Sequence, residues 1–253
     1  MAYPPLAVQL IVFSHEMDLH TQTADVLDAV AAAGFGAIEA GVDFHAEAPA
    51  AWRAELDARG LRLAGLHGGL DQDLDQTLRL LEAYDSHDLC ISSLGGWENV
   101  LYDNYMRDIE RFNQMGRACL TQGVHLHYHN HSYEFCPTDR GDTGMDLIMA
   151  NMDASAADLC VDVAWVRIGG QDPALFLRTH SHRIGYVHLK DYVGNRHWVE
   201  LGYGVMNFDS VMKALGELPC VRWAAYEQDT SARGAAKSCA LSHRYLVDTF
   251  GYG

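Results

Sequence analysis

The sequence predicts an α/β protein with a (β/α)8 barrel fold. Short apolar runs alternate with longer amphipathic segments along all 253 residues, and this alternation indicates a parallel sheet whose connections are helices. Eight strand–helix units can be counted, which in about 250 residues is the usual size of such a barrel. The alternative is an open doubly wound sheet, which normally carries a Gly-rich phosphate loop after its first strand. Ser14-His15-Glu16-Met17 does not resemble such a loop.

The strands are predicted at the short apolar runs, because a strand that is covered on both faces needs little polar surface. In chain order they are Ala7–Phe13, Ala37–Ala40, Leu61–Leu66, Leu89–Ser92, Val124–His129, Leu159–Val163, Ile184–Leu189 and Arg222–Tyr226.

The helices are predicted in the amphipathic stretches that follow the strands. In chain order they are Thr21–Ala33, Ala48–Arg59, Asp73–Tyr84, Tyr102–Gln122, Met145–Asn151, Pro173–His180, Phe208–Leu215 and Ala232–Thr249. Thr23 and Asp25 stand near the start of the first helix and Gly34 follows its end, as helix capping favours. Gly60 and Gly123 end the second and fourth helices in the same way. No linker or low-complexity tract divides the chain, so we expect one domain over residues 1–253.

The composition argues against several classes of partner. The chain has 34 Asp and Glu against 18 Lys and Arg, a formal net charge of −16, whereas nucleic acids and anionic membranes attract a basic surface. The six cysteines form no CxxC pair, and neither a signal peptide nor an apolar run of about 20 residues is visible. We therefore expect a reduced cytoplasmic protein that binds neither nucleic acid nor membrane. The sequence leaves open whether it forms a homo-oligomer.

Polar or titratable residues stand at the carboxyl end of nearly every predicted strand. In chain order these ends carry Ser14-His15-Glu16, Glu39, His67-Gly68-Gly69, Gly95-Gly96-Trp97, a histidine-rich run with Glu134, Asp162, His188-Leu189-Lys190-Asp191 and Glu227. Active sites of (β/α)8 barrels are built at these ends of the strands. The sequence therefore predicts one polar site at that end of the barrel.

The histidine-rich run on the fifth strand is the most distinctive segment. Histidine occupies positions 125, 127, 129 and 131, so on an extended strand all four imidazoles project from one face. Such a stack suits a cavity that binds a metal ion or transfers protons. We expect His129 and His131 at the mouth as substrate-binding groups. His125 is expected to be a buried structural residue, since it lies deepest.

Four segments together resemble the xylose isomerase-like TIM-barrel superfamily of sugar isomerases, epimerases and inosose dehydratases. They are His127–Phe135 with the pattern Tyr-His-Asn-His-x-x-Glu-Phe, Asp162–Trp165, His188–Asp191 and Glu200–Gly204. The resemblance implies that strands five to eight hold one divalent ion through Glu134, Asp162, His188 and Glu227. His129 or His131 is the alternative to Glu134. Three carboxylates and one imidazole suit Mn²⁺, our preferred ion, or Mg²⁺, Co²⁺ or Zn²⁺.

The predicted function is that of a metal-dependent isomerase or epimerase of a ketose, keto-cyclitol or keto-glycoside. A Lewis-acid ion would ease removal of the proton next to the carbonyl. Glu134 and Glu227 would take and return protons from opposite faces, and Lys190 would polarise the carbonyl or protonate a leaving group. His67 and Trp97 are expected to contact the sugar.

Three rival functions follow from the same residues. Elimination of a hydroxyl or glycosidic oxygen would make the protein a lyase or dehydratase. A metal-dependent endonuclease of the same fold is disfavoured by the net charge of −16. A sugar-binding barrel without chemistry would lack one of the four ligands. Asp191 is predicted either to cap the following loop or to join the site, and Gly202 and Gly204 to form a turn or to cradle a phosphate.

Overall fold

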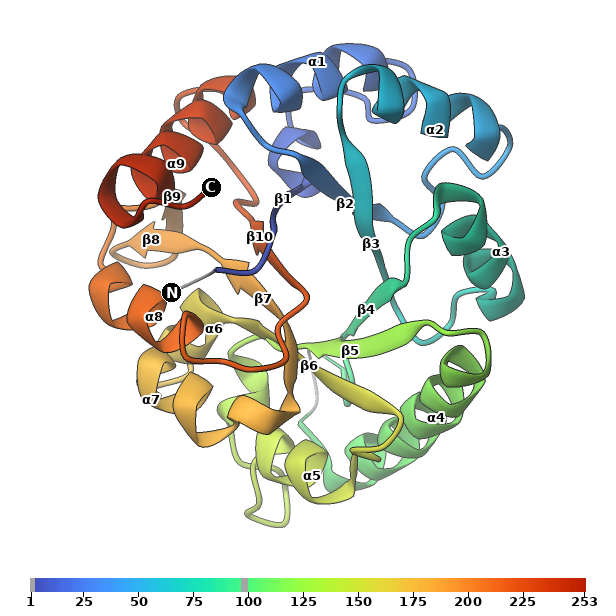
Figure 1. Ribbon diagram of the computed structural model, residues 1–253. Helices are drawn as coiled ribbons and strands as arrows, with labels where there is room; N and C mark the ends of the chain where they lie inside the picture. The colour runs from blue at the N-terminus through green and yellow to red at the C-terminus, as the bar shows by residue number, and fades with distance from the viewer. Residues whose placement is uncertain (1–2, 97–99) are drawn as a thin grey trace.

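Eight parallel strands form a closed barrel in the computed structural model, which describes residues 3–96 and 100–253. The strands follow one another around the barrel in the order β1-β10-β7-β6-β5-β4-β3-β2. Their bounds are β1 Leu6–Gln9, β2 Ala37–Gly41, β3 Arg62–Gly68, β4 Asp88–Ser92, β5 His125–His129, β6 Ala157–Asp162, β7 Ile184–Leu189 and β10 Trp223–Tyr226. Seen along the barrel axis, the helices form an outer ring around the strands (Figure 1). The predicted (β/α)8 fold is confirmed.

Apart from α6, the helices of the outer ring agree in position with the predicted ones. Their bounds are α1 Thr23–Ala33, α2 Pro49–Ala58, α3 Leu74–Tyr84, α4 Tyr102–Thr121, α5 Gly144–Asn151, α6 Val163–Ile168, α7 Pro173–Thr179, α8 Phe208–Leu215 and α9 Ala235–Phe250. Local signals fix several ends. The Asp73 side chain accepts from the third residue of α3, and Thr143 and Asp146 form a capping box on α5. Gly34, at φ 100°, ends α1 in a conformation that glycine adopts without strain.

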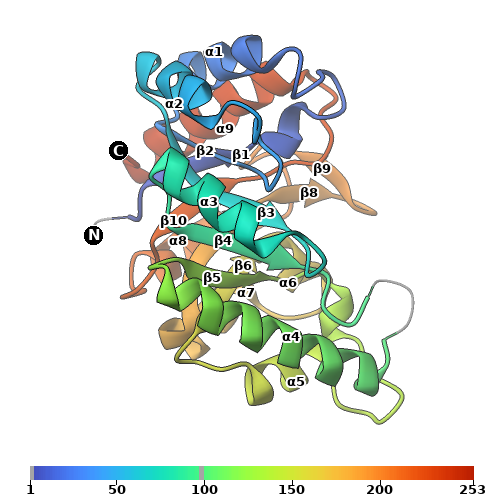
Figure 2. The same cartoon turned by 90° about the vertical axis from the view of Figure 1, so that its right-hand side faces the viewer.

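Three local features differ from the sequence-based prediction. The segment Leu10–Phe13, predicted as strand, is a 3₁₀ helix, η1. The short α6 directly follows β6. A two-stranded hairpin, β8 (Asp191–Val193) and β9 (His197–Val199), follows β7; it lies on the side of the barrel opposite the two termini (Figure 2). Two further 3₁₀ helices are η2 (Tyr133–Phe135) and η3 (Ser181–Arg183). Each of these elements is short, so contacts with neighbouring parts of the chain determine its conformation as much as its own sequence pattern does.

The barrel interior contains a layer of small side chains beneath its carboxyl-end rim. This layer consists of Ala7, Ala37, Ala64, Cys90, Cys160, Ala225 and the larger Tyr186. At the opposite end, Asp88 lies between His127 Nε2 (2.9 Å) and Arg222 Nε (2.6 Å). This ionic cluster holds β4, β5 and β10 together.

His125 does not have the predicted role. It is exposed at the start of β5, because the strand enters the barrel from solvent at its amino end. The buried structural histidine of the run is His127 instead, through its contact with Asp88. Among the described residues, no helix is both long and apolar enough to cross a membrane.

Candidate metal centre

Four side chains from consecutive strand ends converge inside the barrel mouth. They are His129 at the end of β5, Asp162 at the end of β6, His188 on β7 and Glu227 directly after β10. One possible ligand atom from each lies within 4.8 Å of one from every other, and all four residues are buried. Parallel register explains the convergence, because Asp162 pairs with His188, and Ala225, two residues before Glu227, also pairs with His188. We call these four residues the metal-candidate cluster.

The fifth strand contributes His129 to this cluster, where the sequence favoured Glu134. After β5 the chain turns into η2, and Glu134 is fully buried there, outside the cluster. Its carboxylate accepts hydrogen bonds from the Tyr128 hydroxyl and from the His131 backbone N–H. Tyr128 is on the helix-facing side of β5, where it packs edge-on against Phe112 of α4. Glu134 is therefore held behind the strand and outside the metal-candidate cluster, whereas the sequence placed it among the ligands and proton carriers.

The donor set fits a divalent ion. Metal–ligand bonds of about 2.0–2.2 Å place donors on opposite sides of an ion about 4.4 Å apart, close to the spread of the cluster. Asp162 Oδ2 is a buried acceptor with no hydrogen-bond partner among the described residues. Burial, opposed by Lys190, raises the pKa of Asp162 to about 7. A buried carboxylate oxygen that accepts no hydrogen bond, stands 3.9 Å from the Lys190 ammonium and lies beside two imidazoles and a second carboxylate is what a closer cation would satisfy.

His188 is fully buried between two carboxylates. Its Nδ1 donates to Glu227 and its Nε2 to Glu39 Oε2 at 2.8 Å. Burial opposes the charged imidazolium, but the two carboxylates outweigh it and raise the pKa of His188 well above its usual value. Burial opposes ionisation of Glu227 too, yet Lys190 and His188 lower its pKa well below the ordinary range. The cluster thus combines strongly opposed charges away from water.

Lys190 points into the same region from the end of β7. Its ammonium contacts Glu227 Oε1 at 2.6 Å and Asp229 Oδ2 at 2.7 Å. It also stands 4.2 Å from the ring centre of Trp198 on the β8–β9 hairpin. Burial opposes its charge, but Glu227, Asp162 and Asp229 raise the pKa of Lys190 above its usual value. Lys190 is therefore a fixed cation that retains its proton, and of the two predicted roles the structure supports polarisation of a carbonyl.

Two further imidazoles lie beside the cluster. The ring centres of His67 and His131 are each 4.9 Å from that of His129. Burial lowers the pKa of His131 to about 3 and that of His129 well below its usual value, so both rings are neutral at pH 7. Of the predicted substrate contacts, His67 and His131 thus lie next to the candidate centre, and His129 lies within the cluster itself. Trp97 lies outside the described residues.

A family model described as xylose isomerase-like TIM barrel matches residues 27–244. The chain belongs to this family. An inosose dehydratase from Geobacillus kaustophilus is 27% identical over 199 residues, 69% of this chain and 63% of that protein. The chain spans between 53% and 63% of the length of the curated inosose dehydratases that it matches.

Solved structures agree in fold with this xylose isomerase-like barrel. A sugar phosphate isomerase/epimerase from Parabacteroides distasonis superposes with a TM-score of 0.83 at 21% identity, covering 100% of this chain and 96% of the other. The IOLI protein, solved with a bound zinc atom, superposes with a TM-score of 0.74 at 11% identity, covering 96% and 97%. At these identities the likeness concerns the fold.

The sequence did not assign roles to three residues around the cluster of this family member: Glu39, Asp229 and Trp198. The position of Glu39 near the end of the second strand was a usable signal, because inward-facing residues at that rim point toward one centre. Asp229 lies in a loop, and Trp198 lies on the three-residue strand β9, which is too short for periodicity to indicate direction.

Asp191 caps the loop after the hairpin and does not join the cluster. Its carboxylate accepts from the backbone N–H groups of Tyr192, Gly202, Gly204 and Met206 at 2.9–3.2 Å. Gly204 leaves room for this contact, since an added Cβ would lie 2.1 Å from Asp191 Oδ1. Gly202 and Gly204 thus form a turn around the Asp191 carboxylate, and their backbone N–H groups already donate to it.

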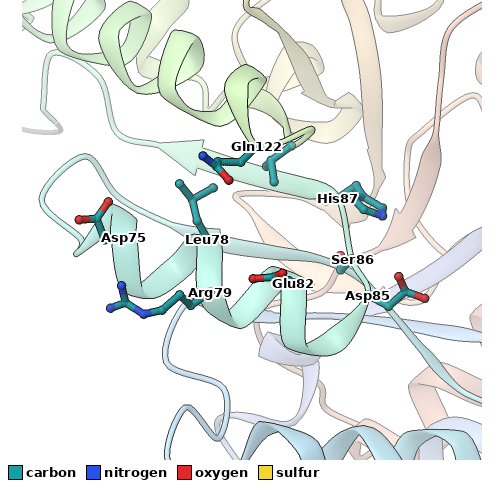
Figure 3. Close-up of a pocket in the computed structure, with 9 residues that line it drawn as sticks. Asp75, Leu78, Arg79, Glu82, Asp85, Ser86, His87 and Gln122 are labelled. Carbon is teal, nitrogen blue, oxygen red and sulfur yellow. The ribbon is translucent and has the colours of Figure 1, made fainter.

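A surface groove beside α3 is separate from the candidate centre (Figure 3). It is lined by Asp75, Arg79, Glu82 and His87 among others. His87 and Val124, which also lines it, immediately precede β4 and β5. The groove therefore lies at the amino ends of the strands, opposite the metal-candidate cluster.

Proposed function

We propose that this protein is a metal-dependent lyase that dehydrates an unphosphorylated keto-cyclitol or keto-sugar. The observation that carries the proposal is the convergence of His129, Asp162, His188 and Glu227 within 4.8 Å of one another, with Lys190 at their edge. These four residues would hold one divalent ion, which when bound supplies Lewis acidity to a substrate carbonyl and a neighbouring hydroxyl. Zinc in the structurally similar IOLI protein is consistent with such a site.

The charges around the cluster support a substrate without phosphate. Among the described residues, Lys190 and His188 are the main positive groups that act on Asp162 and Glu227. The Lys190 ammonium is already paired with Glu227 and Asp229, and both ring nitrogens of His188 face carboxylates. A phosphate group normally needs unpaired cations or free backbone amides. A neutral polyol needs only hydrogen-bonding partners, which the imidazoles of His67 and His131 supply.

The chain's own groups suit proton removal next to a carbonyl. A base takes the proton, and the electrons of the C–H bond pass to the carbonyl oxygen, beside which Lys190 would place its positive charge. In elimination these electrons return and break the C–O bond to the β-hydroxyl. That oxygen receives a proton from the base, which took one from the carbon, and leaves as water.

Dehydration is favoured over epimerisation by the position of Glu134. Epimerisation needs proton carriers on both faces of the substrate carbon, and the predicted pair was Glu134 and Glu227. Glu134 is buried behind β5 and bonded to Tyr128, a position that argues against its forming such a pair with Glu227. The similarity to inosose dehydratases over 69% of the chain supports the same choice.

Isomerisation or epimerisation is the second candidate. It is favoured by the neutral ring of His131, which could return a proton in place of Glu134. The fold likeness to a sugar phosphate isomerase/epimerase is compatible with this function.

Incubation with candidate substrates in D₂O, followed by NMR, tests the proposal. The panel should contain inososes, 3-keto-glycosides and free ketoses, each with Mn²⁺, Mg²⁺, Co²⁺ or Zn²⁺. We expect loss of water from one keto-cyclitol or keto-sugar, with deuterium next to the carbonyl. An epimer or aldose carrying one deuterium would instead establish the second candidate. Neither exchange nor product with any member would exclude both.

A further inference from the structure

Glu39 lies fully buried between two imidazoles of the candidate centre. Oε2 is 2.8 Å from His188 Nε2, and Oε1 is 2.8 Å from His67 Nδ1. The three residues come from β2, β3 and β7. Each carboxylate oxygen of Glu39 thus faces one ring nitrogen, so the side chain can accept one hydrogen bond from each imidazole.

The contact with Glu39 fixes which nitrogen His188 can offer to an ion. Its Nδ1 faces Glu227, a member of the cluster, and its Nε2 faces Glu39, which is not a member. A nitrogen that binds a metal carries no proton, so an ion at Nδ1 requires the remaining ring proton on Nε2. The carboxylate of Glu39 holds that proton there.

The same carboxylate determines the proton position on His67. Nδ1 must carry the proton to donate to Oε1, so a neutral ring has its lone pair on Nε2. One nitrogen of His67 lies within 4.8 Å of nitrogens of His129 and His188, and the side chain is 14% exposed at the mouth. His67 therefore presents a proton acceptor beside the centre and within reach of solvent.

We propose that Glu39 is a positioning residue that sets the tautomers of His188 and His67 together. It turns Nδ1 of His188 toward the ion and Nε2 of His67 toward the substrate. This inference rests on the proposed function, because it assumes that the cluster binds a divalent ion. It adds His67 as the group that exchanges a proton with substrate, with Glu39 behind it as the orienting carboxylate.

A purely structural role explains this arrangement less well. Burying a carboxylate and two imidazoles without water is costly, and apolar residues of the same volume often stabilise such a position equally well. Carboxylates that orient a metal-binding imidazole through its second nitrogen typically change metal affinity by roughly 10- to 100-fold. The role is therefore measurable apart from folding.

The first test is ¹⁵N NMR of histidine-labelled wild-type protein with Zn²⁺, which is diamagnetic. We expect His67 to carry its proton on Nδ1 and His188 to carry its proton on Nε2, with Nδ1 bound to zinc. A His67 proton on Nε2, or zinc on Nε2 of His188, would refute the proposal.

The second test is Zn²⁺ affinity, measured by competition with a chelator. The variant Glu39→Gln has a single acceptor oxygen, so it can satisfy only one ring, and we expect roughly 10- to 100-fold weaker binding. Glu39→Asp should recover part of the affinity. Asp88→Asn is the matched control, since Asp88 is an equally buried carboxylate that contacts an imidazole, His127, at the opposite end of the barrel, and it should bind Zn²⁺ as the wild type does.

The outcomes separate this inference from the proposed function. Wild-type protein that binds no Zn²⁺ or other divalent ion removes the metal centre, and both proposals fall with it. Wild-type affinity retained in folded Glu39→Gln overturns only the role of Glu39. If Glu39→Gln does not fold, the wild-type tautomers still decide the question.

Discussion

Replacing Glu134 by glutamine tests the largest difference between the site expected from the sequence and the arrangement in the structure. The sequence placed Glu134 among the metal ligands, whereas the structure places it behind β5, bonded to Tyr128 and His131. The titratable groups that influence it or contact it are Tyr105, Tyr128, Tyr133 and His131. Glu134→Gln should therefore leave metal binding intact and change the dependence of stability on pH.

The magnitude follows from the burial of the carboxylate. Burial, only partly offset by hydrogen bonds from Tyr128 and from backbone N–H groups, raises the pKa of Glu134 from 4.5 to about 7. A group with a raised pKa in the folded state stabilises the fold at low pH, and this stability is lost as pH rises from 4.5 through 7. One pKa unit corresponds to about 1.4 kcal/mol, so the whole loss is about 3 kcal/mol, of which about 2.5 kcal/mol falls between pH 5 and pH 8.

Urea unfolding of wild type and Glu134→Gln at pH 5 and pH 8 measures this effect. Glutamine carries no charge, so the variant should gain about 2.5 kcal/mol relative to wild type on going from pH 5 to pH 8. Glu82→Gln, an exposed position on α3, is the control and should show no such difference. Metal content is measured on the same samples.

Two results would refute the reasoning. A stability difference between variant and wild type that does not change with pH would mean that Glu134 is not a buried carboxylate of raised pKa. Loss of metal in folded Glu134→Gln would mean that the strand-five ligand is Glu134 after all.

Three other perturbations have defined outcomes. Gly204→Ala would bring a Cβ to 2.1 Å from Asp191 Oδ1 and 2.4 Å from the Tyr192 carbonyl oxygen, so thermal unfolding should show a loss of stability of about 1–3 kcal/mol. The control Gly36→Ala, where an added Cβ meets nothing within 4 Å, should show no such loss. Equal effects of the two substitutions would contradict the geometry of the loop around Asp191. Burial opposes ionisation of Asp88, but His127 and Arg222 lower its pKa, so the carboxylate stabilises the fold above pH 4 and this stabilisation is lost as pH falls. Asp88→Asn should therefore have a lower free energy of unfolding than wild type near neutral pH, and should lose less of it on acidification. The same dependence of the unfolding free energy on pH in both proteins would argue against this. Removal of divalent ions with a chelator should lower the unfolding temperature, and an ion at 100 times its Kd should restore about 2.7 kcal/mol; an unchanged temperature would argue against a bound ion.

Much of the site's location could be predicted because the barrel is periodic. Alternation along β6 and β7 sends Asp162, His188 and Lys190 inward, and parallel register brings these residues to one rim. Glu227 follows β10 at the same rim. Each of these inferences needs only the residue's distance from a strand end.

The fifth strand shows where this reasoning fails. The alternation of side chains along β5 identified the face of the strand from which His129 projects. It gives no information on Glu134, which lies five residues beyond the end of β5. There the backbone turns into η2, and Tyr128, on the opposite face of the strand, binds the carboxylate. The prediction that His125 is buried failed at the other end of the strand, because the burial of a strand residue depends on where the strand enters the barrel wall.

The sequence by itself determined the (β/α)8 fold, the rim that carries the polar groups, and the inward-facing residues of the strands, because these follow from local periodicity and chain order. Only the tertiary structure decided that His129 lies in the metal-candidate cluster while Glu134 lies behind β5, that Glu39 lies between His188 and His67, and that Lys190 contacts Asp229 and Trp198. Those contacts join residues as far apart as positions 39 and 188. They depend on how the strands close into a barrel and on where loops turn after the strands end, which no local pattern encodes.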